Sequence, residues 1–289
     1  MHNQIDIWRR FIGLTKKTEK YPSPFRDAEY TWHLIEPKIS KAYLKEKKND
    51  ITPDVVSSNY NHWIVTDITL DPKKKWDELV SLQNLPSNVL FDLASPKFSS
   101  SLNNPCLLVI GSNNSITKEK CKSNEISGLS LIPNLQFYYQ SKTFKDNNLA
   151  NEFQKNKGED LKNPPTSLLA IPESKGIELK RALRTILFKY ALQEGHFTSN
   201  EIMEDLLLNE IKLFSISSRK KLADKVRKEL IRLSTMLKKT NDGEWLSYNQ
   251  KRDYFSIRKD ISQPNSFKKF DKLLDKWINS NTTQDTLNI

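Results

Sequence analysis

The chain has 289 residues, of which 37% are hydrophobic and 10% aromatic, and its formal net charge is +11. This length and composition are typical of one large folded domain or two ordinary ones. There are only seven glycines, and neither G-x-G-x-x-G nor G-x-x-x-x-G-K-[ST] occurs, which argues against a fold built on a glycine-rich phosphate loop. The positive charge favours a polyanionic partner, and nucleic acid is the leading candidate.

Cys106 and Cys121 are the only cysteines, so neither a disulfide framework nor a cysteine-rich zinc site is expected. No run of about 18 apolar residues is present, so we expect no membrane span and no membrane partner. These features predict an intracellular protein in a reducing compartment, the cytoplasm or the nucleus. The mitochondrion stays open as an alternative, although Asp6 and the few serines argue against a presequence at the N-terminus.

The N-terminal half mixes two kinds of periodicity. Helical patterns occupy 5–21, 26–35, a stretch from Pro37 to about residue 48, and 73–83. Strand patterns occupy 62–70, 105–112 and 134–141. This order predicts an α/β domain over residues 1–145, with a mixed sheet flanked by helices.

A polar stretch containing Pro164 and Pro165 predicts a linker at 146–170, followed by a second domain at 171–289. In that domain, helical patterns at 177–195, 196–208 and 217–240 precede two short aromatic segments and a final amphipathic helix at 267–278. The two aromatic segments, 243–250 and 251–259, predict a hairpin with a basic turn. Three helices followed by such a hairpin resemble winged-helix DNA-binding domains, which implies an α+β fold here.

The third helix of this domain, 217–240, predicts a nucleic-acid contact surface. Leu222, Val226, Leu230 and Leu233 repeat at three- and four-residue steps and are expected to face the core. Between residues 175 and 259 there are 19 Lys and Arg against 11 Asp and Glu. The expected contacts are the basic residues of the helix and of the hairpin turn: Arg219, Lys220, Lys221, Lys225, Arg227, Lys228, Arg232, Lys251 and Arg252. DNA is favoured over RNA as partner, a homodimer is left open, and the alternative is a solvated basic helix without a ligand.

Acidic residues of the N-terminal half predict a different chemistry. Pro53-Asp54 stands thirteen residues before Asp67, which lies in the 62–70 strand, and Glu36 lies upstream in a region of helical pattern. This arrangement resembles the PD-(D/E)xK nuclease superfamily. The resemblance implies an acidic pair on adjacent strands of a mixed sheet that holds Mg²⁺, and a lysine two residues after the second acid that assists the attacking water.

Carried over to this sequence, the resemblance makes Asp54 and Asp67 the metal ligands and Glu36 a catalytic acid on a helix. The position of the usual lysine holds Thr69, so Lys73, or its neighbours Lys74 and Lys75, is expected to supply the catalytic amine from the following helix. The alternative is structural: Asp54 caps a turn after proline, and Asp67 faces outward from a half-buried strand.

These features together predict a Mg²⁺-dependent DNA endonuclease of restriction-like type, in which the winged helix supplies affinity for the target. A rival is a non-enzymatic DNA- or RNA-binding factor, such as a replication initiator, a transcription regulator or an organellar RNA-binding subunit. A third hypothesis is that the protein is an assembly subunit of a nucleoprotein particle. The endonuclease requires the carboxylates of Asp54 and Asp67 to lie close together in a cleft, whereas the rival readings place both on the surface.

Overall fold

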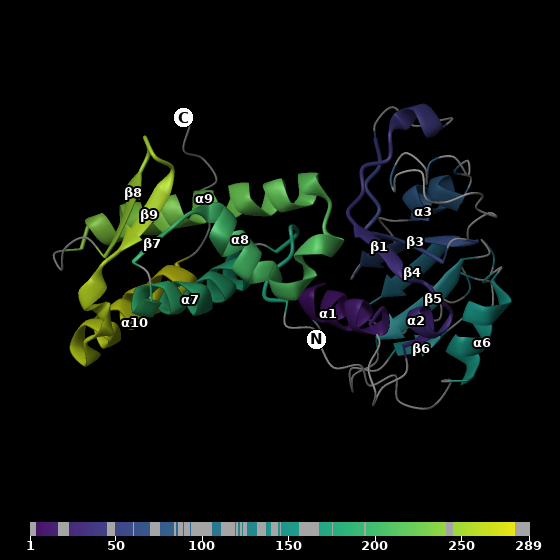
Figure 1. Cartoon of the computed structure of the whole chain (residues 1–289), viewed down its shortest axis with the longest axis horizontal. Coiled ribbons are helices and arrows are strands. Elements are labelled where there is room, and N and C mark those ends of the chain that lie inside the picture. Colours follow the sequence, from purple (N-terminus) through teal and green to yellow (C-terminus); the bar gives the residue numbers. More distant parts are fainter. Residues whose placement is uncertain are drawn as a thin grey trace. The chain divides into compact units, whose positions relative to one another are not determined.

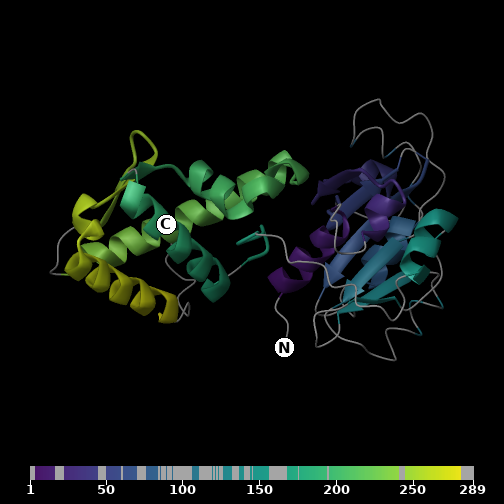
Figure 2. The same ribbon diagram turned by 60° about the horizontal axis from the view of Figure 1, so that its bottom comes forward.

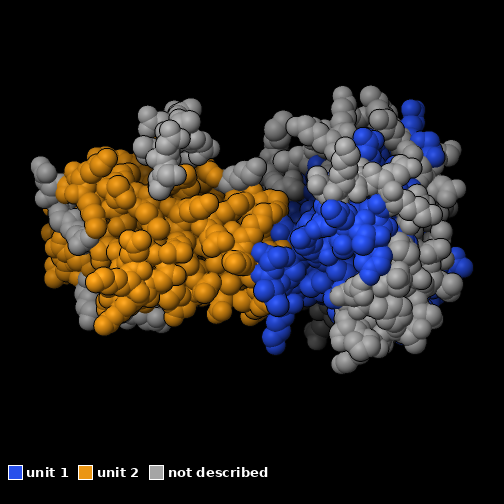
Figure 3. Space-filling model, turned by 90° about the horizontal axis from the view of Figure 1, so that it is seen from above, with its two compact units in different colours: residues 1–167, 212–217 blue, residues 168–211, 218–289 orange. Residues whose placement is uncertain are grey.

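The fold is known from a computed structural model. It describes residues 4–16, 23–44, 50–59, 61–69, 76–83, 106–110, 126–131, 137–139, 146–155, 168–174, 176–193, 195–240 and 245–280, together with seven single residues, Leu85, Val89, Leu93, Glu119, Cys121, Ser123 and Phe144. The chain divides into two compact units (Figure 3). Unit 1 comprises residues 1–167 and 212–217, and unit 2 comprises residues 168–211 and 218–289.

Unit 1 is a mixed α/β unit (Figure 1). Its described helices are α1 (Gln4–Leu14), α2 (Pro24–Asp27), the short 3-10 turn η1 (Lys41–Tyr43), α3 (Trp76–Gln83) and α6 (Asn147–Lys155). Its strands are β1 (Trp32–Ile35), β2 (Val55–Ser58), β3 (Trp63–Thr69), β4 (Cys106–Ile110), β5 (Ser127–Leu131) and β6 (Phe137–Tyr139).

The six strands form one sheet in sequence order, from β1 to β6 (Figure 2). The first three strands form an antiparallel meander, β3 to β5 run parallel to one another, and β6 is antiparallel to β5. Parallel neighbours need a crossover connection, and α3 lies on the one between β3 and β4. The expected mixed sheet with flanking helices is therefore confirmed.

The two faces of the β1–β3 meander are covered by different helices. On one face Val56, Trp63 and Val65 join a buried cluster with residues of α3, including Leu79 and Leu82. Because side chains alternate along a strand, Ile64, Thr66 and Ile68 point to the other face. α1 contacts β3 and β4. The ring of His33 meets Phe25 of α2 edge-on, with 6.3 Å between the ring centroids.

Two expectations for the N-terminal half are wrong. Residues 26–35 form the single turn α2 followed by strand β1, because pairing of Trp32–Ile35 with β2 overrides the local helical preference. The helix expected from Pro37 towards residue 48 is replaced by a bridge between Ile39 and Ile51 and the short turn η1, while 45–49 lie outside the described residues. Strands β2 and β5 were not expected at all.

The expected linker at 146–170 begins with a helix. Asp146 caps α6, because one of its carboxylate oxygens accepts from the backbone N–H of Asn148 at 2.8 Å. Phe153 of α6 is buried and packs its ring on Phe25 and Phe144, with centroids 5.6 and 5.3 Å apart. The helix therefore belongs to unit 1. It was not predicted because its few apolar residues stand among polar ones that are typical of a linker.

Unit 2 is mainly helical with a small sheet. Its elements are α7 (Gly176–Gln193), β7 (His196–Phe197), α8 (Ser199–Leu207), most of the 3-10 segment η3 (Leu208–Leu213), most of α9 (Ile216–Lys238), β8 (Leu246–Asn249), β9 (Tyr254–Ile257), the turn η4 (Lys259–Ser262) and α10 (Pro264–Asn279). The three strands form an antiparallel sheet in the order β7-β9-β8. The three expected helices, the hairpin and the final helix are thus all confirmed.

Local sequence signals explain the ends and the orientation of these helices. Thr198 caps α8 in a capping box, in which its hydroxyl accepts from the backbone N–H of Glu201 and the Glu201 carboxylate accepts from the backbone N–H of Thr198. In α9, Leu222, Val226 and Leu230 are fully buried, as expected from their spacing. The opposite face of α9 is consequently the one that unit 2 exposes.

Candidate active site and nucleic-acid interface

Asp54 and Asp67 lie side by side on neighbouring strands of the sheet. Asp54 immediately precedes β2, and the antiparallel register, with Val55 opposite Thr66, brings it beside Asp67 in β3. The backbone N–H of Asp54 donates to Asp67 Oδ1 at 3.3 Å, and the backbone N–H of Ile68 donates to Asp54 Oδ2 at 2.5 Å. Each carboxylate is therefore held against the backbone of the strand that carries the other.

Both carboxylates are buried. The exposed fraction is 8% for Asp54 and 0% for Asp67, so the structural alternative of an outward-facing Asp67 is wrong. By strand alternation, Asp67 shares its face with Val65 and Thr69, which is the face covered by α3. Two acidic groups in a medium of low polarity are costly unless a proton or a cation compensates them.

Glu36 lies in the same cross-strand row but not on a helix. It directly follows β1, its backbone N–H donates to the carbonyl of Asp54 at 2.8 Å, and its side chain is 4% exposed. Its φ is 49°, and the Ser215 hydroxyl donates to its carbonyl at 2.8 Å. Within the described residues, no group of three or more His, Cys, Asp and Glu side chains is arranged to hold a metal ion, so the structure brings together only the pair Asp54 and Asp67.

The source of a catalytic amine is not found among the described residues near this pair. Thr69, which occupies the usual lysine position, is buried on the same face as Asp67. Lys73, Lys74 and Lys75 lie outside the described residues, so the expectation that Lys73 supplies the amine stays a prediction. A threonine hydroxyl can accept and donate hydrogen bonds but carries no positive charge.

His33 and Cys121 of unit 1 could react chemically, but their surroundings give them structural roles. Burial lowers the pKa of His33 to about 4, and its ring Nδ1 lies 2.8 Å from the Ser57 hydroxyl. His33 and Ser57 face away from Asp67, because they alternate with the residues of its face. Burial also raises the pKa of the Cys121 thiol to about 12, so this cysteine stays protonated and is a poor nucleophile.

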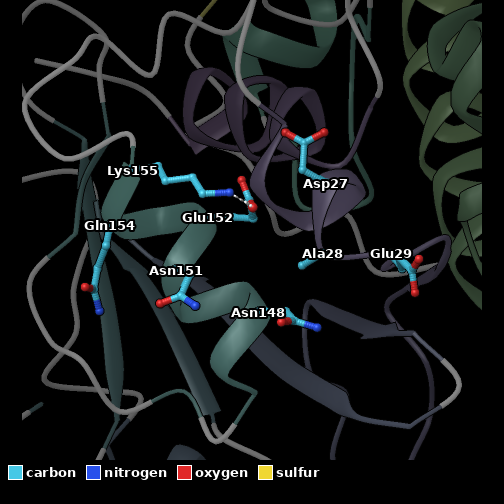
Figure 4. A pocket seen from close by; sticks show the side chains of 8 residues that line it. All are labelled: Asp27, Ala28, Glu29, Asn148, Asn151, Glu152, Gln154 and Lys155. Atoms are coloured by element: carbon cyan, nitrogen blue, oxygen red, sulfur yellow. Dashed lines mark hydrogen bonds and ion pairs between the residues drawn. The ribbon is translucent and has the colours of Figure 1, made fainter.

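A pocket of about 620 Å³ lies between α2 and α6 in unit 1 (Figure 4). Its lining is polar and consists of Asp27, Ala28, Glu29, Asn148, Asn151, Glu152, Gln154 and Lys155. Lys155 and Glu152 form an ion pair along α6, with 2.5 Å between Nζ and Oε1. Neither Asp54 nor Asp67 lines this pocket, so it is not the cleft that the endonuclease hypothesis requires.

The basic residues expected to bind nucleic acid fall into two groups in unit 2. One group is exposed and, within the part of the chain that the structure describes, makes no side-chain ion pair: Lys220 and Lys228 on α9, and Lys251 and Arg252 in the turn of the β8–β9 hairpin. Arg219 is half-buried. The other group contacts acceptors of the protein itself: Lys221, Lys225, Arg227 and Arg232.

The contacts of the second group tie α9 to its surroundings. Lys221 pairs with Glu173 at 2.7 Å, and the half-buried Lys225 donates to the carbonyl of Pro172. Arg232 pairs with Glu229 at 2.8 Å within the helix. Arg219 and Lys225 were expected to be exposed, and that expectation is wrong, since both are half-buried; their contact with nucleic acid stays a prediction. No sequence signal could have identified the partner of Lys225, because Pro172 lies 53 residues away and accepts through its backbone.

Arg227 joins α9 to the turn of the hairpin. Its guanidinium donates to the hydroxyl of Tyr248 at 3.1 and 2.6 Å and lies 3.2 Å from the Asp253 carboxylate, which also accepts from the Tyr248 hydroxyl at 2.8 Å. The hydrogen bond to Tyr248, together with the nearby Asp253 carboxylate, raises the pKa of Arg227 above its ordinary value. Lys251 and Arg252, which lie between Tyr248 and Asp253 in sequence, are therefore carried by a turn that is fastened to α9.

A comparison with known families finds one match in this chain. Residues 2–75 match the family model of the MJECL32 domain. The matched stretch runs from α1 through β3 and so contains Glu36, Asp54 and Asp67, and the name of the domain states no activity. Neither a curated protein nor a solved structure matches the chain.

Among the described residues, no helix is long and apolar enough to cross a membrane. The longest, α9, carries a basic face along much of its length.

Proposed function

We propose that the protein is a Mg²⁺-dependent nuclease that acts on DNA, with its acidic centre in unit 1 and its DNA-binding surface in unit 2. The observation that carries this proposal is the pairing of Asp54 and Asp67 on adjacent strands of a mixed sheet, which the resemblance to the PD-(D/E)xK superfamily predicts. Burial of both groups fits a cation site, because a bound cation offsets the cost of burying two carboxylates.

The donor set fits magnesium. Mg²⁺ is commonly held in proteins by one or two carboxylates, with water and substrate phosphate oxygens as its other ligands. Asp54 and Asp67 would hold the ion, and when bound it would neutralise charge on the scissile phosphate and activate water. Thr69 cannot replace the positive charge of the usual lysine, so a lysine of 73–75 is the proposed source of that charge.

The order of elements supports a winged-helix domain in unit 2. Helix α7, strand β7, helices α8 and α9, and the hairpin β8–β9 follow one another, and the first strand pairs with the last. In such domains one helix enters the major groove of DNA. Here α9 takes that role, because its buried leucines fix the core face and leave Lys220 and Lys228 exposed.

Cleavage of supercoiled plasmid by the purified full chain tests this function. With Mg²⁺ or Mn²⁺ we expect nicked and linear products, and we expect Asp54→Asn and Asp67→Asn to abolish them while DNA binding persists. Asp77→Asn, which changes an exposed carboxylate in the first turn of α3, is the matched control and should leave cleavage intact. The absence of any metal-dependent cleavage by the wild-type chain would refute the nuclease proposal.

A second candidate is a non-enzymatic DNA- or RNA-binding factor. It is favoured by the threonine at the lysine position and by the pocket between α2 and α6, whose lining includes neither Asp54 nor Asp67. In that case Asp54 and Asp67 fasten β2 to β3 through the backbone N–H groups they accept from. The same two Asn variants would then lower the free energy of unfolding and leave no cleavage activity to lose.

A further inference from the structure

Helix α10 presents a row of lysines on one face. Lys268, Lys269, Lys272 and Lys276 are all exposed. Lys268, Lys272 and Lys276 are spaced by four residues, so they lie nearly above one another, about 6 Å apart along the axis at each step. We call these three residues the α10 lysine row.

The opposite face of α10 is fixed in the core of unit 2. Phe270, Leu274 and Trp277 are buried there. Phe188 of α7 packs on Phe267 and Phe270, with ring centroids 4.7 and 5.8 Å apart. The helix therefore cannot rotate to hide its lysines, and the α10 lysine row is held facing solvent.

The acidic residues of α10 do not neutralise this row. Arg184 of α7 pairs with Asp271 at 2.5 Å and with Asp275 at 2.9 Å, so one guanidinium holds both carboxylates on the α7 side of the helix. The C-terminal carbonyl of Trp277 accepts from the buried Lys180 amine at 2.9 Å. The favourable position for a cation at the helix C-terminus is thus already filled by Lys180.

We propose that the α10 lysine row is a second surface that binds the phosphate backbone of nucleic acid, separate from α9 and the hairpin turn. A row of cations at regular spacing is complementary to a polyanion with regularly spaced charges. Figures 1 and 2 show the hairpin turn and α10 on different sides of unit 2, so the two surfaces contact different stretches of a long nucleic acid. A membrane surface is disfavoured, because an interfacial helix must insert the apolar face that α10 buries in the core.

The inference is tested with the full chain by fluorescence anisotropy on a labelled 30-base-pair duplex between 50 and 200 mM salt. Each phosphate contact contributes about 0.9 to the slope of log affinity against log salt concentration, so the variant Lys268→Gln/Lys272→Gln/Lys276→Gln should lower the slope by about 2 to 3. A control with the same loss of charge is Lys38→Gln/Lys41→Gln/Lys155→Gln in unit 1, which should keep the wild-type slope. Both variants must first give the circular dichroism spectrum of the wild type, which shows that they fold.

The variant Lys220→Gln/Lys228→Gln, measured in the same series, separates the two surfaces. A wild-type slope for the α10 variant overturns the inference, and a lowered slope for the α9 variant then still supports the α9 interface. A lowered slope for the α10 variant with a wild-type slope for the α9 variant supports the α10 surface and refutes the α9 interface. No binding by the wild-type chain refutes both. If the α10 variant instead loses binding to vesicles of phosphatidylcholine and phosphatidylserine while its duplex binding is unchanged, the partner is a membrane and the inference is wrong.

Discussion

Lys225 and Lys228 lie three residues apart on α9, yet the structure gives them different roles. Lys225 is half-buried and donates to the carbonyl of Pro172, whereas Lys228 is exposed. We predict that Lys228→Gln removes a phosphate contact and that Lys225→Gln does not. Lys225→Gln should instead lower the free energy of unfolding, because it removes a charged donor from a partly buried carbonyl.

The size of both effects follows from their positions. One phosphate contact contributes about 0.9 to the salt slope on duplex DNA. Between 50 and 200 mM salt, a fourfold change, loss of that contact makes the affinity of the Lys228 variant fall about 3.5-fold less than that of the wild type. A hydrogen bond from a charged group is worth about 1.5–3 kcal/mol when buried, and partial exposure of Lys225 reduces this to about 1 kcal/mol.

The assay combines anisotropy titrations over this salt range with urea unfolding of each variant. Lys228→Gln should change the slope and leave the unfolding midpoint unchanged. Lys225→Gln should shift the midpoint and leave the slope unchanged. A wild-type slope in both variants, or a slope that changes only for Lys225→Gln, would show that α9 does not bind DNA through the face that the structure exposes.

Three further predictions concern stability. Leu230→Ala should lower the free energy of unfolding by about 2–5 kcal/mol, since this side chain is fully buried, and calorimetry that finds no change would contradict the packing of α9. Thr198→Ala should cost about 0.5–2 kcal/mol in denaturant unfolding by removing the cap of α8, unless the capping box does not form. The pKa of His33 is about 4 in the folded chain against 6.5 when unfolded, so its neutral ring stabilises the fold fully above pH 6.5. The free energy of unfolding should fall by up to about 3 kcal/mol as the pH falls from 6.5 to 4, and urea unfolding of His33→Gln should show a weaker pH dependence.

Much of unit 2 could be predicted from sequence because its signals are local. The leucines of α9 repeat at helical spacing, Thr198 and Glu201 form a recognisable cap, and aromatic residues alternate in the hairpin. Each of these features was expected and is present. The contacts of Lys225 and Arg227 could not be predicted, because their partners are distant in sequence and include a backbone carbonyl.

In unit 1 the resemblance to the PD-(D/E)xK superfamily implied the pairing of two acids, but the residues alone gave only part of their setting. The β-branched and aromatic neighbours of Asp67 predicted its strand, whereas strand β2, which follows Asp54, was not predicted. Glu36 was expected on a helix, because 26–35 has local helical preference, whereas strand pairing with β2 decides its conformation. Strand β5, with Ser127, Gly128 and Ser130 in its five residues, lacks the apolar pattern by which a buried strand is found.

The central claim is that Asp54 and Asp67 together hold a divalent cation, and binding of Mn²⁺ to the full chain tests it most directly. Isothermal titration calorimetry should find one site in the wild-type chain, and either Asp54→Asn or Asp67→Asn should weaken it steeply, since one hard anionic ligand is lost. Asp77→Asn should bind Mn²⁺ as the wild type does. Undiminished Mn²⁺ binding in both Asn variants, or none in the wild-type chain, would contradict the claim.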